Sequence, residues 1–205
     1  MKVIEYDARY KQDFIDFNSA WITDNFGHLE PEDIETFEKI DEESLDCTNI
    51  EERKMLEIGM KAPEFSLPDQ NGQMHKLSDY KGQKVILYFY PADMSPGCTN
   101  QACSFRDMYP QIREKGAVVL GVNADTVESH KKFETEHGLP FLLLSDPEKK
   151  VLQEYDVWKE RSMFGKPVMG IERSTYLIDE DGVIIKAFGK VKPKDNAGQM
   201  LKELS

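Results

Sequence analysis

Strand-length apolar runs alternate with helical segments along residues 59–205, and this alternation decides the fold class. The run KVILYFY at 84–90 is typical of a strand buried on both faces. The expected strands are residues 65–67, 74–77, 84–90, 117–122, 141–144, 174–178 and 183–188. The expected helices are residues 98–115, 126–137, 149–155 and 195–204. This order predicts an α/β fold with a mixed central sheet flanked by helices, and an antiparallel hairpin at one edge.

Acidic side chains are concentrated at the start of the chain. Residues 1–57 hold 17 acidic and 6 basic side chains, whereas residues 58–205 hold 21 and 20. We therefore expect two domains: an acidic N-terminal extension over 1–57, with a strand and two helices, and a second domain over 58–205. The negative charge argues against binding to nucleic acid or to an anionic membrane.

The location expected for the chain is the cytoplasm. No run approaches the roughly 18 apolar residues that a membrane span needs. The opening residues MKVIEYDARY contain no apolar core of a signal peptide. Three cysteines, Cys47, Cys98 and Cys103, are too few for a multi-bridge framework.

In a reducing compartment, a close cysteine pair such as Cys98 and Cys103 does redox or metal chemistry more often than structural work. A zinc site is disfavoured, because His75 and His130 both lie more than 20 residues from the pair. Redox chemistry is therefore the expectation.

Cys98 follows a buried strand and a Pro96-Gly97 turn, and it opens a helix. Unpaired backbone N–H groups and the positive end of the helix dipole favour an anion at that position. A thiol there ionises more readily, and the thiolate is the nucleophile. Ser95, three residues upstream, can turn its hydroxyl toward the same pocket. The alternative is a buried structural cysteine.

Cys103 lies five residues beyond Cys98. In an intact α-helix their Cα atoms would be about 8.6 Å apart, beyond the roughly 7 Å limit for a disulfide. A bond between them requires the first helical turn to unwind. The spacing suits a switch between a folded helix and a locally melted one, and the alternative is that Cys103 is an inert thiol.

Residues 59–204 resemble a peroxiredoxin of the bacterioferritin-comigratory (PrxQ) subfamily. The matching segments are GMKAPEF at 59–65, LYFYP at 87–91, SPGCT at 95–99, QAC at 101–103 and ERSTYLI at 172–178. The resemblance implies a thioredoxin-like fold and a thiol peroxidase that reduces hydrogen peroxide and organic hydroperoxides.

The family's active-site motif, P-x-x-x-T/S-x-x-C with a distant arginine, corresponds here to Pro91, Ser95, Cys98 and Arg173. Most members carry threonine where this chain has Ser95. The resemblance implies that Cys98 is the peroxidatic residue and Cys103 the resolving one. Arg173 would favour the thiolate and bind peroxide oxygens, while Pro91 would shield the sulfur from water. No metal, haem or flavin is implied.

The partners that the resemblance implies are a hydroperoxide substrate and thioredoxin or a similar dithiol reductant, and we expect a monomer or weak dimer. Two other functions stay open. A thiol–disulfide oxidoreductase is disfavoured because the C-x-x-C spacing of thioredoxins is missing. A redox-inactive thioredoxin-fold adaptor is disfavoured because the complete motif is present.

Residues 1–45 resemble the opening strand and helices of GNAT acetyltransferases, in the segment IEY at 4–6, in Phe14, Asn18 and Trp21, and in LEPED at 29–33. The family's Q/R-x-x-G-x-G/A loop, which binds the acyl-CoA pyrophosphate, is missing from the sequence. We therefore expect an appended module rather than acetyl transfer, and we expect Cys47 to have no redox role.

Overall fold

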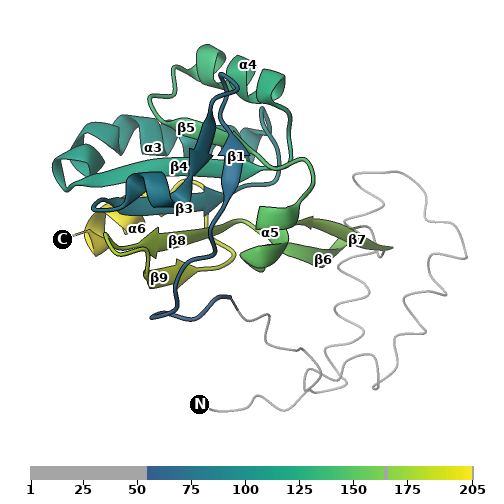
Figure 1. The fold of residues 1–205 in the computed structure, drawn as a ribbon. Helices are drawn as coiled ribbons and strands as arrows, with labels where there is room; N and C mark the ends of the chain where they lie inside the picture. Colours follow the sequence, from purple (N-terminus) through teal and green to yellow (C-terminus); the bar gives the residue numbers. More distant parts are fainter. Residues whose placement is uncertain (1–54, 164–165, 205) are drawn as a thin grey trace, which may run out of the picture. The chain divides into compact units, whose positions relative to one another are not determined.

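The computed structural model of the protein describes residues 55–163 and 166–204 (Figure 1). The predicted N-terminal strand and helices, the GNAT-like segment and Cys47 therefore lie outside the described residues. Within the described ranges, no helix is both long enough and apolar enough to cross a membrane.

A five-stranded mixed sheet forms the centre of the fold, as the sequence predicts. Its strands are β3 (Lys84–Phe89), β4 (Ala117–Asn123), β5 (Leu142–Ser145), β8 (Ser174–Ile178) and β9 (Ile184–Phe188). The strand order is β5-β4-β3-β8-β9. β3, β4 and β5 run parallel, whereas β8 is antiparallel to β3, and the β8–β9 hairpin occupies one edge.

Alternate side chains of β3 pack on opposite faces of the sheet. Ile86 and Tyr88 join the core beneath three helices: α3 (Pro96–Glu114), α4 (Val127–His137) and α6 (Asn196–Glu203). Helices α3 and α6 pack against each other.

The opposite face carries Leu87 and Phe89, which pack with α5 (Lys150–Glu154) and with the segment that precedes β3. That segment contains β1 (Ser66–Pro68), β2 (Met74–Lys76) and the 3-10 helix η2 (Leu77–Tyr80). β1 and β2 correspond to two strands that the sequence predicts, and they form an antiparallel pair.

Helix α3 begins two residues earlier than the sequence predicts. Pro96 occupies its first turn, where a missing N–H and a fixed φ suit the start of a helix. Ser95 is the N-cap residue, with an extended backbone. The earlier start places Cys98 inside the first turn instead of at its first residue.

The sequence does not predict one hairpin, formed by β6 (Trp158–Met163) and β7 (Lys166–Ile171). The two strands pair with each other and lie outside the central sheet. Figure 1 shows this ribbon extending away from the sheet beside α5. Its lower apolar content conceals the strand pattern, and Pro167 and Gly170 are residue types that interior strands avoid.

Candidate active site

Cys98 is the third residue of α3, and its side chain is almost entirely buried, with 1% of its surface exposed. The first hydrogen bond of the helical ladder runs from the Thr99 amide to the Ser95 carbonyl, at 2.9 Å. The amides of Gly97 and Cys98 come before this bond and are not used by the ladder. The sulfur therefore lies at the helix end where backbone dipoles favour negative charge, as the sequence predicts.

Arg173 reaches this sulfur from the connection between β7 and β8. Its Nη2 atom donates a hydrogen bond to Cys98 Sγ at 3.1 Å. Its Nη1 atom donates to the side-chain carbonyl of Gln101, one turn further along α3. The structure thus brings together two predicted site residues that are 75 positions apart in the sequence. A guanidinium held in this way places a fixed positive charge beside the sulfur.

Pro91 and Ser95 lie on the loop that joins β3 to α3, and both are partly buried. The Ser95 hydroxyl donates to the Ala92 carbonyl at 3.2 Å, so in this structure its hydrogen bond shapes the loop. Met94, between them, has a left-handed backbone with φ of 58°. Because a non-glycine residue rarely adopts this conformation, the loop is held by its surroundings.

Cys98 and Cys103 are both free thiols, and Cys103 is partly exposed. Helix α3 runs without interruption through both positions. In this folded form, the geometry of the helix keeps the two sulfurs from bonding, since their Cα atoms are about 8.6 Å apart in an ideal helix. The structure therefore represents the state in which Cys98 lies beside Arg173.

Two polar residues near the cysteine are not identified by the sequence reasoning. One is Gln101, which is fully buried and links Arg173 to α6 through a 2.7 Å hydrogen bond to Asn196. The other is Asp93 on the cysteine loop. Apart from Tyr90, which is three residues from Asp93, their partners lie 30 or more residues away in the sequence, so no local motif marks either network.

The Asp93 carboxylate accepts hydrogen bonds from Tyr90 (2.8 Å), Ser129 (2.7 Å) and Asn123 (3.3 Å), and it contacts His130 Nδ1 at 2.9 Å. Burial alone would raise the pKa of Asp93. The hydrogen bond and charge of His130, with the Ser129 and Tyr90 hydroxyls, outweigh burial and hold this pKa below its usual value. The network ties the cysteine loop to β4 and α4.

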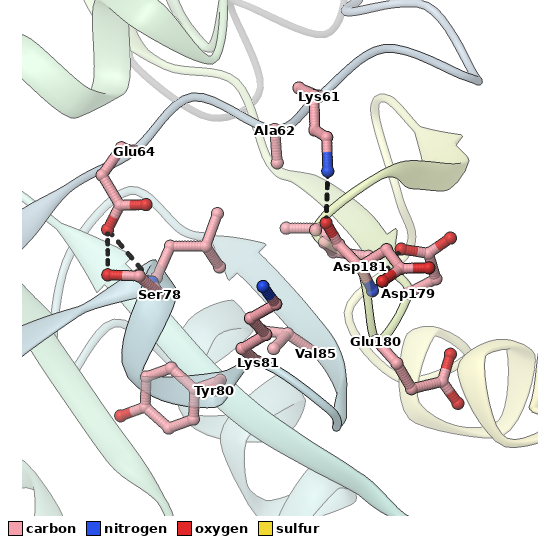
Figure 2. A pocket seen from close by; sticks show the side chains of 13 residues that line it. Lys61, Ala62, Glu64, Ser78, Tyr80, Lys81, Val85, Asp179, Glu180 and Asp181 are labelled. Atoms are coloured by element: carbon pink, nitrogen blue, oxygen red, sulfur yellow. Dashed lines mark hydrogen bonds between the residues drawn. The ribbon is translucent and has the colours of Figure 1, made fainter.

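A cavity of about 200 Å³ lies at the other end of β3. Val85, which pairs with Ile178, lines the cavity, whereas the cysteine loop follows the opposite end of the strand, where Phe89 pairs with Ser174. Figure 2 shows Lys61 beside Asp181, with the Lys61 ammonium donating to the Asp181 carbonyl at 2.6 Å. None of the predicted site residues lines this cavity, so it is separate from the Cys98 site.

Known proteins are similar to this chain in sequence and in fold. The model of the AhpC/TSA family matches residues 58–187. Peroxiredoxin Bcp of Bacillus subtilis is 52% identical over 149 residues, which cover 73% of this chain and 95% of that protein. Peroxiredoxin Bcp of Escherichia coli is 43% identical over 141 residues, covering 69% of this chain and 90% of its own.

Solved structures agree with these relatives. The bacterioferritin comigratory protein of Xanthomonas campestris has a TM-score of 0.66 and 37% identity, covering 68% of this chain and 89% of its own. A cysteine-to-serine variant of Xylella fastidiosa PrxQ has a TM-score of 0.70 and 35% identity, covering 74% and 96%. The predicted thioredoxin-like fold is confirmed. The chain belongs to the AhpC/TSA family and, within it, to the peroxiredoxins of the Bcp/PrxQ type.

Proposed function

We propose that this peroxiredoxin reduces hydroperoxides with the Cys98 thiolate, and that Cys103 then resolves the oxidised sulfur to an intramolecular disulfide. One observation carries the assignment. A buried sulfur at the start of a helix receives a hydrogen bond from an arginine that is itself held by a second side chain, Gln101. The helix end and the guanidinium place positive charge beside the sulfur, where the attack on a peroxide needs it.

In the first step, the Cys98 thiolate attacks the terminal oxygen of the peroxide. The O–O bond breaks, the sulfur becomes a sulfenic acid, and the other oxygen leaves as an alkoxide or hydroxide that takes up a proton. Negative charge moves from the sulfur to the leaving oxygen. The Arg173 guanidinium and the amides of Gly97 and Cys98 are placed to stabilise that charge.

In the second step, Cys103 attacks the sulfenic sulfur, forming the S–S bond and releasing water. Helix α3 must unwind between the two cysteines for this to occur. A dithiol such as thioredoxin then restores both thiols by exchange. We propose a cytoplasmic location, because the cycle depends on such a reductant, and a monomer or weak dimer, because both cysteines lie on one helix.

Mass spectrometry after one equivalent of hydrogen peroxide tests the proposal. We expect a Cys98–Cys103 disulfide in the wild type and a dimedone-reactive sulfenic acid at Cys98 in Cys103→Ser. Cys47→Ser is the matched control and should behave as the wild type. A disulfide from Cys98 to Cys47, or to a second chain, would overturn the role of Cys103.

The substrate preference of the reduced protein distinguishes a peroxidase from a thiol–disulfide oxidoreductase. The reduced protein should consume peroxide rapidly in stopped-flow mixing and should reduce a model protein disulfide only slowly. The opposite order of rates would show that the cysteine pair serves disulfide exchange. Failure to react with either substrate would favour the redox-inactive adaptor.

We also propose that residues 1–57 form a domain separate from the catalytic one. The family match begins at residue 58, and relatives aligned over about three quarters of this chain cover nearly their whole length. A variant that lacks residues 1–57 should keep the peroxidase activity of the full chain. Loss of activity in a folded variant would show that the extension contributes to the site.

A further inference from the structure

We propose that Asn196 is a positioning residue that latches the start of α3 and thereby controls how often Cys103 can reach Cys98. The α6 latch consists of Gln101, Thr175 and Asn196, which come from α3, β8 and α6. This inference rests on the proposed peroxidase cycle. It adds a residue on the C-terminal helix that decides the fate of the oxidised sulfur.

Gln101 is the link between the latch and the reacting cysteine. It lies between Cys98 and Cys103 on α3, and its side chain is fully buried. Its carbonyl oxygen accepts from Arg173 Nη1, while its Nε2 donates to Asn196 Oδ1 at 2.7 Å. The same guanidinium donates to Cys98 Sγ through Nη2. The chain of contacts therefore runs from the sulfur to α6.

Asn196 is held from a second direction. Its Oδ1 also accepts a hydrogen bond from the Thr175 hydroxyl at 2.9 Å. Asn196 and Thr175 are both fully buried, and Asn196 Nδ2 has no hydrogen-bond partner among the described residues. Two donors converging on one oxygen fix the orientation of this amide, so the acceptor is ready for Gln101.

Resolution must break this latch. Cys98 and Cys103 cannot bond while α3 is intact, and Gln101 lies within the segment that has to unwind. When Gln101 leaves, its hydrogen bonds to Arg173 and Asn196 are both lost, and the buried groups that remain lose a partner. The latch therefore opposes unwinding and keeps the sulfur beside Arg173.

The latch also determines how much of the sulfenic acid is over-oxidised to sulfinic acid and how much forms the disulfide; this ratio is called the partition below. While α3 stays folded, a second peroxide can transfer an oxygen to Cys98, which breaks its O–O bond and gives a sulfinic acid and water or an alcohol. Once α3 unwinds, Cys103 instead displaces water and forms the disulfide. A weaker latch favours the disulfide, and a stronger latch favours over-oxidation.

Asn196→Ala tests the latch in the full-length protein. We expect the peroxide concentration that gives a fixed fraction of Cys98 sulfinic acid per turnover to rise about three- to tenfold, as expected for the loss of one buried hydrogen bond that opposes unwinding. Mass spectrometry during turnover with thioredoxin and its reductase measures this fraction. Thr175→Val, which keeps the shape and removes the donor, should shift the partition in the same direction.

Two variants separate the latch from general stability. Asn196→Asp keeps an acceptor oxygen at the same place and should restore the wild-type partition. Lys202→Gly, at an exposed position of α6, weakens the same helix away from the latch, so it should lower the melting temperature and leave the partition unchanged. If Asn196→Asp behaves as Asn196→Ala, or Lys202→Gly shifts the partition equally, the latch is wrong.

The first step is measured separately in a Cys103→Ser background. There Asn196→Ala should change the rate of sulfenic acid formation by no more than about twofold, because Arg173 keeps its contacts with Gln101 and Cys98. An equal loss in both steps would overturn the latch and make Asn196 a support for Arg173 alone. A wild type that forms no disulfide would instead refute the proposed function itself.

Discussion

His130 Nδ1 lies 2.9 Å from a carboxylate oxygen of Asp93, and the two side chains are 0% and 2% exposed. Asp93 belongs to the loop that precedes Cys98, whereas His130 belongs to α4. The contact therefore attaches the cysteine loop, next to the left-handed residue Met94, to a helix on the flank of the sheet. Four groups converge on the carboxylate, which makes it the centre of a buried network.

Asp93→Asn should lower the free energy of unfolding at pH 7 by about 2–4 kcal/mol, because it removes the negative charge beside His130 and replaces one of the two acceptor oxygens with an amide NH2 group. The pKa of Asp93 is lower in the folded protein than its usual value, so its stabilising contribution is complete above about pH 4. The contribution is lost as the pH falls through the folded-state value.

Urea titrations at pH 7, 5 and 3 measure this dependence. The difference between wild type and Asp93→Asn should be equal at pH 7 and 5 and smaller at pH 3. Asp107→Asn, at an exposed carboxylate paired with Arg106, should change stability by less than about 0.5 kcal/mol at pH 7. A difference that grows at pH 3 would contradict the assigned direction.

Arg173→Lys should slow sulfenic acid formation at Cys98 by about 10–100-fold, because an ammonium cannot contact the sulfur and Gln101 at once. Stopped-flow consumption of hydrogen peroxide by the reduced protein measures the rate. Arg106→Lys is the matched change at a surface arginine and should have no effect. An Arg173→Lys protein as fast as wild type would remove the guanidinium from the proposed chemistry.

Tyr88→Phe should leave the free energy of unfolding unchanged or raise it by up to about 1 kcal/mol. The Tyr88 hydroxyl is buried and has no hydrogen-bond partner among the described residues. Its removal therefore eliminates a desolvation cost that no hydrogen bond offsets. Tyr176→Phe is the contrasting variant: that hydroxyl donates to the Tyr155 carbonyl at 2.8 Å, and its loss should cost about 1 kcal/mol. Thermal and urea unfolding of both variants compare them directly.

Gly121→Ala should destabilise the protein by about 2–3 kcal/mol through overpacking. A Cβ at Gly121 would lie 2.8 Å from the ring of Tyr88, which stacks between Tyr90 and Phe105 and cannot move aside. Gly198→Ala is the control, since a Cβ there meets only Met108 at 3.7 Å. That change, inside α6, should instead stabilise the protein by about 0.5–1 kcal/mol.

The sequence predicted the elements that obey local rules. The apolar run of β3, the helix that carries Cys98 and the hairpin around Gly182 all depend on neighbouring residues, and all three are present, although the helix begins at Pro96 instead of Cys98. Gly182 has φ of 78°, a conformation that its place in the turn requires. Arg173 was found only because its surrounding segment resembles a family motif.

What the sequence did not predict depends on contacts between distant residues. The β6–β7 ribbon is stabilised by the pairing of its own two strands, and its charged and small residues give no apolar alternation. Gln101 and Asn196 are 95 residues apart, and nothing near either one marks it as a partner of the other. Nor does the sequence predict that the Ser95 hydroxyl, which can turn toward the pocket of Cys98, donates a hydrogen bond to the Ala92 carbonyl.

Because only 1% of the surface of Cys98 is exposed, the size of a reagent determines whether it can reach the sulfur. A molecule as small as hydrogen peroxide can reach such a sulfur with little rearrangement, while a bulky electrophile has to wait until α3 opens. In a variant that carries Cys47→Ser and Cys103→Ser, labelling of Cys98 by a large maleimide therefore counts openings of the helix, and peroxide consumption counts the closed population. The two reagents together would report the equilibrium between the closed and the open form of α3 around Cys98.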